Sequence, residues 1–153
     1  MGFYQFKKTQ EINSSIEEVW SFISNPENLK KITPEYMGFV IVSESIPSKM
    51  YEVRIIEYRV SPLFGLKTTW VTEITNYKKN KYFVDEQRIG PYKIWHHQHI
   101  LEPTENGVMM TDIISYQPPY GILGKLANAI IIKKKLKEIF DYRTVVIREI
   151  FNS

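Results

Sequence analysis

The histidines of residues 94–100, IWHHQHI, have the residue type and spacing best suited to chemistry. This segment is predicted to be a β-strand, in which alternate side chains point to the same side, so His97 and His99 share one face with Trp95. The opposite face carries His96 beside isoleucine and glutamine. Since imidazole titrates near neutral pH, such a pair can transfer a proton, bind a metal or hydrogen-bond a carboxylate. The pair therefore marks a candidate site whose partners depend on the neighbouring elements.

Several other kinds of chemistry are excluded or disfavoured by what the sequence lacks. It has no cysteine, which excludes a disulfide scaffold, a thiolate or iron–sulfur centre and a cysteine nucleophile. It has no GxSxG, P-loop or Rossmann glycine motif, so serine hydrolysis, nucleotide hydrolysis and hydride transfer are disfavoured. The first residues contain no apolar run of signal-peptide length, so we expect a cytoplasmic protein.

Length and composition are typical of one globular unit. The chain has 153 residues, 43% of them hydrophobic and 24% charged, so we expect a single domain over residues 1–153. The net charge is +3, and the segment from Tyr120 onwards holds seven Lys or Arg against three Asp or Glu. A nucleic-acid-binding domain would more often show a dense basic stripe with interleaved aromatic residues, so no nucleic-acid partner is expected. We interpret the lysines at 133–135 as a solvated helix face.

The hydrophobic pattern predicts a strand, two short helices, six more strands and one long helix. Residues 3–12 alternate like a strand, and Ser15 begins a capped helix. A second short helix is predicted at 27–32. The further strands are predicted near residues 38–45, 50–60, 66–76, 81–89, 93–102 and 107–117. The final helix, from about residue 121, has a predicted apolar stripe of Leu123, Leu126, Ala127, Ile130, Leu136, Ile139, Phe140, Arg143, Val146, Ile147 and Ile150.

The long final helix is the only predicted element large enough to cover an antiparallel sheet of this size. We therefore predict an α+β fold in which a curved seven-stranded antiparallel sheet wraps around that helix and leaves a cavity between them. Arg143 falls on the buried stripe and needs a carboxylate partner, which we expect on the sheet. Helical geometry turns at least one isoleucine of 130–132 outward, where it could serve a dimer contact or a lipid surface.

Residues 90–124, GPYKIWHHQHILEPTENGVMMTDIISYQPPYGILG, resemble the START-like or SRPBCC superfamily, which includes polyketide cyclase, dehydrase and lipid-transport proteins. The resemblance continues through Phe140 and Arg143 and covers nearly the whole chain. It implies the helix-grip fold and the binding of a small hydrophobic or amphipathic ligand, lipid-like or polyketide-like, in the cavity. Because such folds also host enzymes, a cyclase or dehydratase acting in the same cavity is the alternative. We expect no cofactor, at most peripheral membrane contact, and leave a homodimer open.

The resemblance also implies which side chains face the cavity. Alternation then places residues of the neighbouring strands beside the histidines. Leu63 and Phe64 lie at a predicted hairpin tip, where apolar residues suggest a flap over the cavity, a membrane-touching tip or packing on a neighbouring helix. The predicted ligand-binding residues are Trp70, Phe83, Asp85, Gln87, Trp95, His97, His99, Met110, Asp112 and Tyr116, together with Leu63 and Phe64.

Four interpretations of the histidine pair remain open. The first is a structural network of satisfied hydrogen bonds, and the second is orientation of a ligand's polar group. The third is acid–base catalysis by His97 or His99 with Asp112 behind it. The fourth is a metal site: strand histidines about 6.7 Å apart at Cα can converge on zinc with Asp112 or Asp85, although no stronger zinc motif such as HExxH is present. We expect no metal on this evidence.

Overall fold

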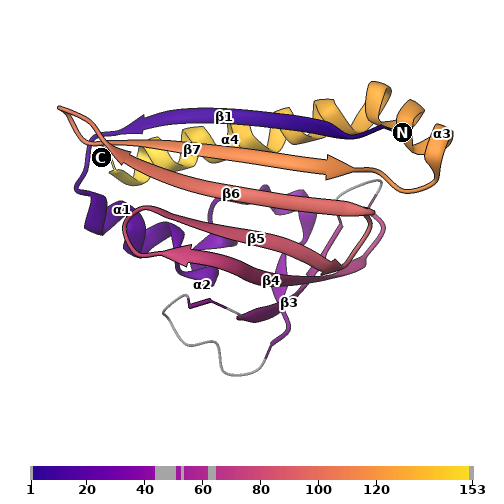
Figure 1. The fold of residues 1–153 in the computed structure, drawn as a ribbon, viewed down its shortest axis with the longest axis horizontal. Coiled ribbons are helices and arrows are strands. Elements are labelled where there is room, and N and C mark those ends of the chain that lie inside the picture. The colour runs from indigo at the N-terminus through magenta and orange to yellow at the C-terminus, as the bar shows by residue number, and fades with distance from the viewer. Residues whose placement is uncertain (1, 44–50, 53, 62–64, 152–153) are drawn as a thin grey trace.

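The computed structural model describes residues 2–43, 51–52, 54–61 and 65–151. It confirms the predicted α+β helix-grip architecture, in which a curved antiparallel sheet packs around a long C-terminal helix (Figure 1). The strands are β1 (Tyr4–Ile12), β2 (Val40–Ile41), β3 (Ile55–Val60), β4 (Thr68–Lys78), β5 (Tyr82–Ile89), β6 (Ile94–Pro103) and β7 (Val108–Gln117). The helices are α1 (Ile16–Ile23), α2 (Pro26–Leu29), α3 (Gly121–Ala127) and α4 (Lys133–Phe151), with a 3-10 turn at Glu35–Met37 and a π turn at Asn128–Ile132.

The seven strands form one sheet in the order β1-β7-β6-β5-β4-β3-β2. Each strand from β2 to β6 is antiparallel to the next in the chain, and β1 pairs antiparallel with β7. Short turns join β5 to β6 and β6 to β7. In the β6–β7 turn, Gly107 has φ +157°, and the carbonyl oxygen of Ile12 lies only 2.1 Å from where a Cβ would stand. The inward faces of β5, β6 and β7 therefore lie side by side.

Three predicted element boundaries were wrong. Within the described residues, the strand expected at 38–45 is reduced to Val40–Ile41, and its start is delayed because Gly38 ends the preceding 3-10 turn in a left-handed conformation. The strand expected at 50–60 begins at Ile55, and residues 44–50 lie outside the described part of the chain. The helix expected at 27–32 ends at Leu29, whose carbonyl oxygen accepts the Thr33 hydroxyl at 2.6 Å just before Pro34.

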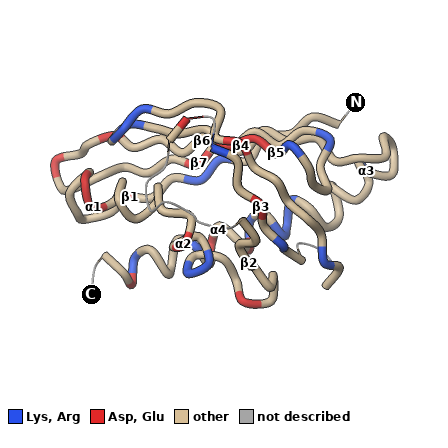
Figure 2. Tube along the Cα trace, turned by 90° about the horizontal axis from the view of Figure 1, so that it is seen from below, with Lys and Arg blue, Asp and Glu red and all other residues tan. Residues whose placement is uncertain are grey.

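Helix α4 lies along the concave side of the sheet, as the quarter-turned view shows (Figure 2). Its buried residues are Leu136, Phe140, Arg143 and Ile147, which recur at three- and four-residue steps. Two apolar clusters form beneath it, one around Ile147 and Phe83 and the other around Phe140 and Ile114. The predicted stripe is thus confirmed from Leu136 to Ile147, but it was wrong at its last residue, since Ile150 is 39% exposed.

The stripe was wrong at the beginning of the helical segment. Leu123, Leu126 and Ile130 are exposed. The residues buried there instead are Gly124, Asn128 and Ile132, which continue to Leu136 in steps of four. A π turn has more residues per turn than an α-helix, so across Asn128–Ile132 a spacing of four stays on one side.

Two specific contacts select these unusual buried positions. Gly124 packs so closely on the Pro119 carbonyl oxygen that a Cβ would lie 1.9 Å from it. The Tyr116 hydroxyl donates a hydrogen bond to Asn128 Oδ1 at 2.7 Å, and both residues are buried. A glycine packed on the residues after β7 and an asparagine bonded to β7 are therefore buried, while neighbouring leucines face outward.

Replacing Tyr116 by phenylalanine is expected to lower the free energy of unfolding by about 1–3 kcal/mol, because the buried Asn128 Oδ1 then loses its donor. Urea unfolding followed by circular dichroism measures the loss. Tyr82→Phe, at a half-buried tyrosine of β5, is the matched control and should change stability by less than about 0.5 kcal/mol. Equal effects of the two changes would contradict this role for the Tyr116 hydroxyl.

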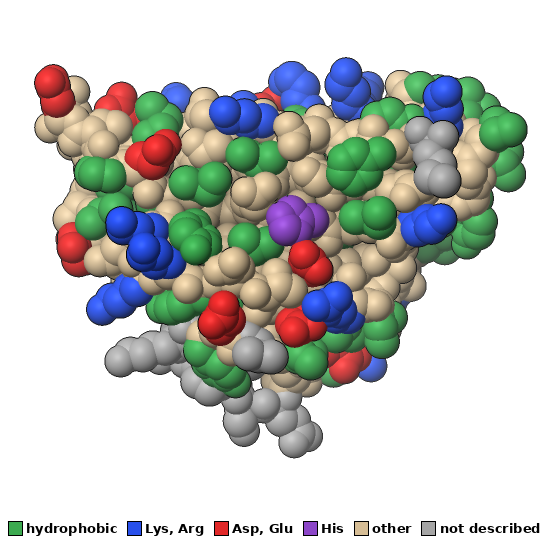
Figure 3. All heavy atoms as spheres, viewed as in Figure 1, with side chains coloured by type: hydrophobic (Ala, Val, Ile, Leu, Met, Phe, Trp, Pro, Cys, Tyr) green, Lys and Arg blue, Asp and Glu red, His purple; other side chains and the backbone are tan. Residues whose placement is uncertain are grey.

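The outward-facing leucines leave an apolar surface at one end of the molecule. Tyr120, Ile122, Leu123, Leu126 and Ile130 are all more than half exposed. Figure 3 shows hydrophobic side chains gathered at this end, over α3. Within the described residues, no helix has the length and apolar character needed to span a membrane.

Candidate functional site

A cavity of about 170 Å³ lies between the concave face of the sheet and the helices. Strands β3 to β7, the α1–α2 segment and α4 all contribute to its wall, and most lining residues are apolar or aromatic. The polar lining residues are Asn25, Thr33, Thr72, Asp85, His97, His99, Asp112 and Arg143. Five of these, from Asp85 to Arg143, make one polar cluster on the wall.

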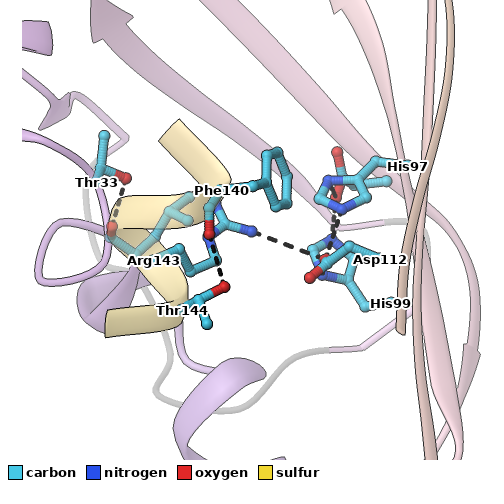
Figure 4. Close-up of polar contacts among 9 residues, drawn as sticks. Thr33, His97, His99, Asp112, Phe140, Arg143 and Thr144 are labelled. Carbon is cyan, nitrogen blue, oxygen red and sulfur yellow. Dashed lines mark hydrogen bonds and ion pairs between the residues drawn. The ribbon is translucent and has the colours of Figure 1, made fainter. Parts of the chain in front are cut away.

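Strand register brings this cluster together. Asp85 on β5 lies directly opposite His97 on β6, and His99 lies directly opposite Asp112 on β7. All four side chains point to the concave side, and His97, His99 and Asp112 are less than a tenth exposed. Figure 4 shows both imidazoles and Asp112 on the strands, with Arg143 approaching from α4.

The two imidazoles lie in contact between the two carboxylates, with their ring planes tilted by 35°. Their ring centroids are 3.7 Å apart. Asp112 Oδ1 lies 2.8 Å from His97 Nε2 and 3.2 Å from His99 Nδ1. Asp85 Oδ2 lies 2.6 Å from His99 Nε2 and 3.5 Å from His97 Nδ1. Every ring nitrogen of the pair therefore faces a carboxylate oxygen.

Arg143 brings a positive charge to the same group. Its Nη1 lies 3.8 Å from Asp112 Oδ1, which confirms the prediction that this buried arginine is paired with a carboxylate on the sheet. Its guanidinium carbon also lies 4.5 Å from the ring centre of Phe140. Arg143 Nε is buried without a hydrogen-bond partner among the described residues. The arginine thus stabilises Asp112 mainly through charge.

Burial and pairing act in opposite directions on the carboxyl groups. Burial alone would raise the pKa of Asp112, but hydrogen bonds from His97 and His99 outweigh it and hold the pKa well below its usual range. Asp85 follows the same balance, and its pKa is also lowered, chiefly by the charge of His97 and by its bond to His99. Both carboxyl groups are therefore ionised at neutral pH.

The two histidines are driven apart in pKa although they contact the same carboxylates. Burial lowers the pKa of His97, and the charge of neighbouring His99 lowers it further. Burial also opposes the charge on His99, but hydrogen bonds to Asp112 and Asp85 overcome it and raise the pKa. Since the rings are in contact, a second proton on one ring opposes a second proton on the other, and the opposite pKa shifts favour His99 over His97 for it.

An aromatic wall adjoins the cluster. Trp70 packs edge-on against Trp95, with ring centres 5.1 Å apart, and Tyr92 lies 4.9 Å from Trp95. Phe83 stacks on His99 with ring centres 4.0 Å apart. Met110, Trp70, Trp95 and Phe83 all line the cavity, as expected. This arrangement presents flat apolar surface next to a charged group.

Two of the predicted ligand-binding residues lie outside the cavity lining. The Gln87 amide donates to the Tyr92 carbonyl oxygen at 2.7 Å and accepts from the Tyr92 N–H at 3.2 Å, so it holds the β5–β6 turn. Tyr116 is directed to Asn128. Leu63 and Phe64 lie outside the described residues. Sequence reasoning placed Gln87 and Tyr116 by the family resemblance and by alternation, which give the face of a residue and not its partner.

Sequence reasoning missed several lining residues. Tyr92 was assigned to a turn, and Phe140 and Leu136 were assigned only to a helix stripe, yet all three line the cavity. The signal for the two helix residues was available, because a stripe that covers a cavity must also line it. No comparable signal marked Tyr92, since its position depends on the Gln87 contacts.

Asp85, His97 and His99 are also the residues able to hold a metal ion. Each offers one ligand atom, and these atoms all lie within 4.8 Å of one another. Chemically, the site combines a hydrophobic pocket, hydrogen-bond donors and acceptors, and three side chains able to bind a cation.

Solved structures of similar fold cover nearly the whole chain. Protein CV1439 from Chromobacterium violaceum has a TM-score of 0.72 and 12% identity, over 97% of this chain and 98% of its own. A protein from Arthrobacter aurescens has a TM-score of 0.70 and 15% identity, over 95% of this chain and 86% of its own. StfQ, a di-domain ARO/CYC from the steffimycin biosynthetic pathway, has a TM-score of 0.73 and 11% identity, over 98% of this chain and 51% of StfQ. Neither a protein-family model nor a curated protein sequence matches the chain.

At these identities the comparisons show the fold alone. The chain has the helix-grip fold, and it spans about half the length of StfQ. Folds of this kind host unrelated activities, so the function has to be argued from the site.

Proposed function

We propose that this protein binds a small amphipathic molecule, lipid-like or polyketide-like, in the cavity between the sheet and α4. The observation that carries the proposal is an apolar cavity with its charged groups gathered on one wall. Ligand sites commonly have this composition, because apolar walls supply affinity and a few convergent polar groups fix orientation. Asp85 is the outer carboxylate, with 16% of its side chain exposed against 3% for Asp112. It is therefore the group placed to meet the polar end of a ligand.

The volume of the cavity limits the ligand. An engineered apolar cavity of about 150 Å³ accepts a benzene molecule, so about 170 Å³ suits one or two fused rings or a short branched chain. Each buried methylene contributes about 0.8 kcal/mol, so a ligand of this size reaches micromolar affinity after the costs of association. The body of the ligand would lie against Trp70, Trp95 and Phe140.

Fluorescence titration with 2-naphthol and 2-methylnaphthalene tests the proposal. The two probes have nearly the same shape, but only 2-naphthol has a hydroxyl that can donate to Asp85. We expect saturable binding of 2-naphthol that is at least tenfold tighter than that of 2-methylnaphthalene. Ile139→Trp, on the cavity wall, should abolish binding of both probes by filling the space.

Ile100→Trp is the matched control, because Ile100 lies on β6 but is not among the cavity residues. This variant should bind both probes as the original protein does. Absence of saturable binding, or equal binding by Ile139→Trp and Ile100→Trp, would overturn the proposal.

The alternative predicted from the sequence, a cyclase or dehydratase, uses the same cluster. It is favoured by the 2.8 Å contact between His97 Nε2 and Asp112, which orients one imidazole. The two functions differ in what His97→Ala does. A binding protein loses ligand affinity, whereas an enzyme loses turnover with substrate affinity nearly unchanged.

The exposed side chains of α3 are the surface on which we expect any lipid or dimer contact. Leu123 and Leu126 are exposed on adjacent helical turns, and Lys125 lies between them. Apolar side chains beside lysines are typical of peripheral contact with a lipid surface.

A further inference from the structure

We propose that Asp85, His97 and His99 form a binding site for one divalent transition-metal ion, with Asp112 positioning both histidines behind it. The metal ion would bind without any organic ligand, so this inference goes beyond the ligand binding proposed above. The open side of the ion would face the cavity.

The ligand atoms are His97 Nδ1, His99 Nε2 and Asp85 Oδ2. The oxygen lies 3.5 Å from the first nitrogen and 2.6 Å from the second, and the three atoms lie within 4.8 Å of one another. A zinc ion holds such ligands at about 2.0–2.2 Å, so two of them can stand at most roughly 4.4 Å apart. Small side-chain movements are enough to bring all three onto one ion.

Asp112 occupies the position of a supporting carboxylate. Its Oδ1 contacts the far nitrogen of each ring, His97 Nε2 at 2.8 Å and His99 Nδ1 at 3.2 Å. Metal-binding histidines commonly donate their other ring N–H to such a carboxylate, which fixes the tautomer and orients the ring. With both protons directed at Asp112, the lone pairs of His97 Nδ1 and His99 Nε2 both face Asp85.

The four nitrogen–oxygen contacts of the cluster need more hydrogens than two neutral imidazoles carry. Four ring nitrogens face carboxylate oxygens, but two neutral imidazoles have only two N–H groups. When both rings are neutral and Asp112 accepts both N–H groups, two nitrogen lone pairs and the oxygen of Asp85 face one another with no hydrogen among them. In the metal-free protein a second proton on His99 relieves this repulsion, and a metal ion would take the place of that proton and turn the three acceptors into three ligands.

Ligand type and charge identify the class of ion. Two imidazole nitrogens and one carboxylate oxygen suit Zn²⁺ or another first-row divalent ion, rather than Mg²⁺ or Ca²⁺, which prefer oxygen ligands. Asp85 and Asp112 carry two negative charges and Arg143 one positive charge, so the cluster with neutral histidines has a net charge of −1. A divalent ion brings it to +1. A carboxylate, phenolate or enolate in the cavity would complement that charge and complete the coordination.

His96 provides an internal control. It lies on the same strand, and its Nδ1 is 2.7 Å from Glu86 Oε1, so it also pairs with a carboxylate. However, it lies on the opposite face of β6, and its side chain is 36% exposed. The same residue types therefore occur outside and inside the cavity, but only the inner set combines three ligand residues with a supporting carboxylate.

Titration of ZnCl₂ into chelator-treated protein, followed by calorimetry, tests the proposal without any organic ligand. We expect one Zn²⁺ per chain at micromolar affinity or tighter. Asp85→Asn and His99→Gln, which keep side-chain size, should each weaken binding at least 100-fold. Asp112→Asn should weaken it about 10–100-fold, because it disturbs the supporting contact. His96→Ala should leave the affinity unchanged.

Circular dichroism shows whether each variant is folded, and a folded Asp85→Asn is sufficient for the comparison. The visible spectrum of bound Co²⁺ should show imidazole ligation in the original protein and lose it in Asp85→Asn. No stoichiometric binding by the folded protein would mean that protons alone complete the network, and the proposal would be overturned. Binding that survives in Asp85→Asn but is lost in His96→Ala would overturn it equally.

The outcome is separate from the ligand proposal. If 2-naphthol binds in the presence of chelator and Zn²⁺ does not bind, the cavity function stands and the metal site fails. If Zn²⁺ binds and neither naphthalene probe does, the reverse holds.

Discussion

Replacing Asp112 by alanine is expected to lower the free energy of unfolding by about 3–5 kcal/mol. Asp112 is 2% exposed, and its carboxylate contacts both imidazoles and Arg143. Without it, the guanidinium stays buried without its nearest opposite charge, and two ring N–H groups lose their acceptor. Urea unfolding, followed by tryptophan fluorescence and by circular dichroism, measures the difference.

Two further variants show whether the loss comes from the buried charge. Asp112→Leu combined with Arg143→Met removes both charges and should recover part of the stability, because a buried pair can often be replaced by apolar groups. Asp141→Ala breaks the surface pairs with Lys8 and Lys137 and should cost at most about 1 kcal/mol. A loss in Asp112→Ala no larger than in Asp141→Ala would show that the cluster contributes nothing to stability.

Phe140→Ala is expected to destabilise the protein by about 3–5 kcal/mol, since it removes a buried ring and leaves a larger void. Phe140 is 3% exposed, and its ring centre lies 5.2 Å from Phe6 and 5.7 Å from His97. Because Phe140 lines the cavity, the void joins the ligand site. Saturating 2-naphthol should therefore raise the melting temperature of this variant more than that of the original protein.

Tyr142→Ala is the control for Phe140→Ala. Tyr142 is two positions away on the same helix, is exposed, and does not line the cavity. Its replacement should change stability by less than about 0.5 kcal/mol. If 2-naphthol shifted the melting temperature of all three proteins equally, Phe140 would not form part of the ligand site.

The sequence carried enough information to predict which residues share the cavity wall. Side chains alternate along a strand, so His97 and His99 share one face. The family resemblance implied that this face points inward, together with Asp85 and Asp112 on the neighbouring strands. The structure agrees, because β5, β6 and β7 are neighbours in the sheet. The apolar spacing of Leu136, Phe140 and Ile147 likewise predicted the helix that covers them.

Alternation did not predict the pairwise contacts. A register shift of two residues would keep every side chain on its face but separate Asp85 from His97. The observed register depends on the β5–β6 turn, where Gln87 holds the backbone of Tyr92 through two hydrogen bonds. Gln87 was predicted to touch a ligand because its face was known and its partner was not.

The chain by itself therefore determined the number of strands and a curved sheet around the final helix, since these follow from local periodicity and from the need to cover an apolar face. Its resemblance to a known superfamily implied the helix-grip fold and the residues on the concave wall. Only the tertiary structure decided which carboxylate faces which ring nitrogen, that Arg143 meets Asp112, and that Asn128 is buried while Leu126 is exposed. These features depend on strand register and helix phase. Both are set by packing between residues far apart in the chain, and no short segment contains that information.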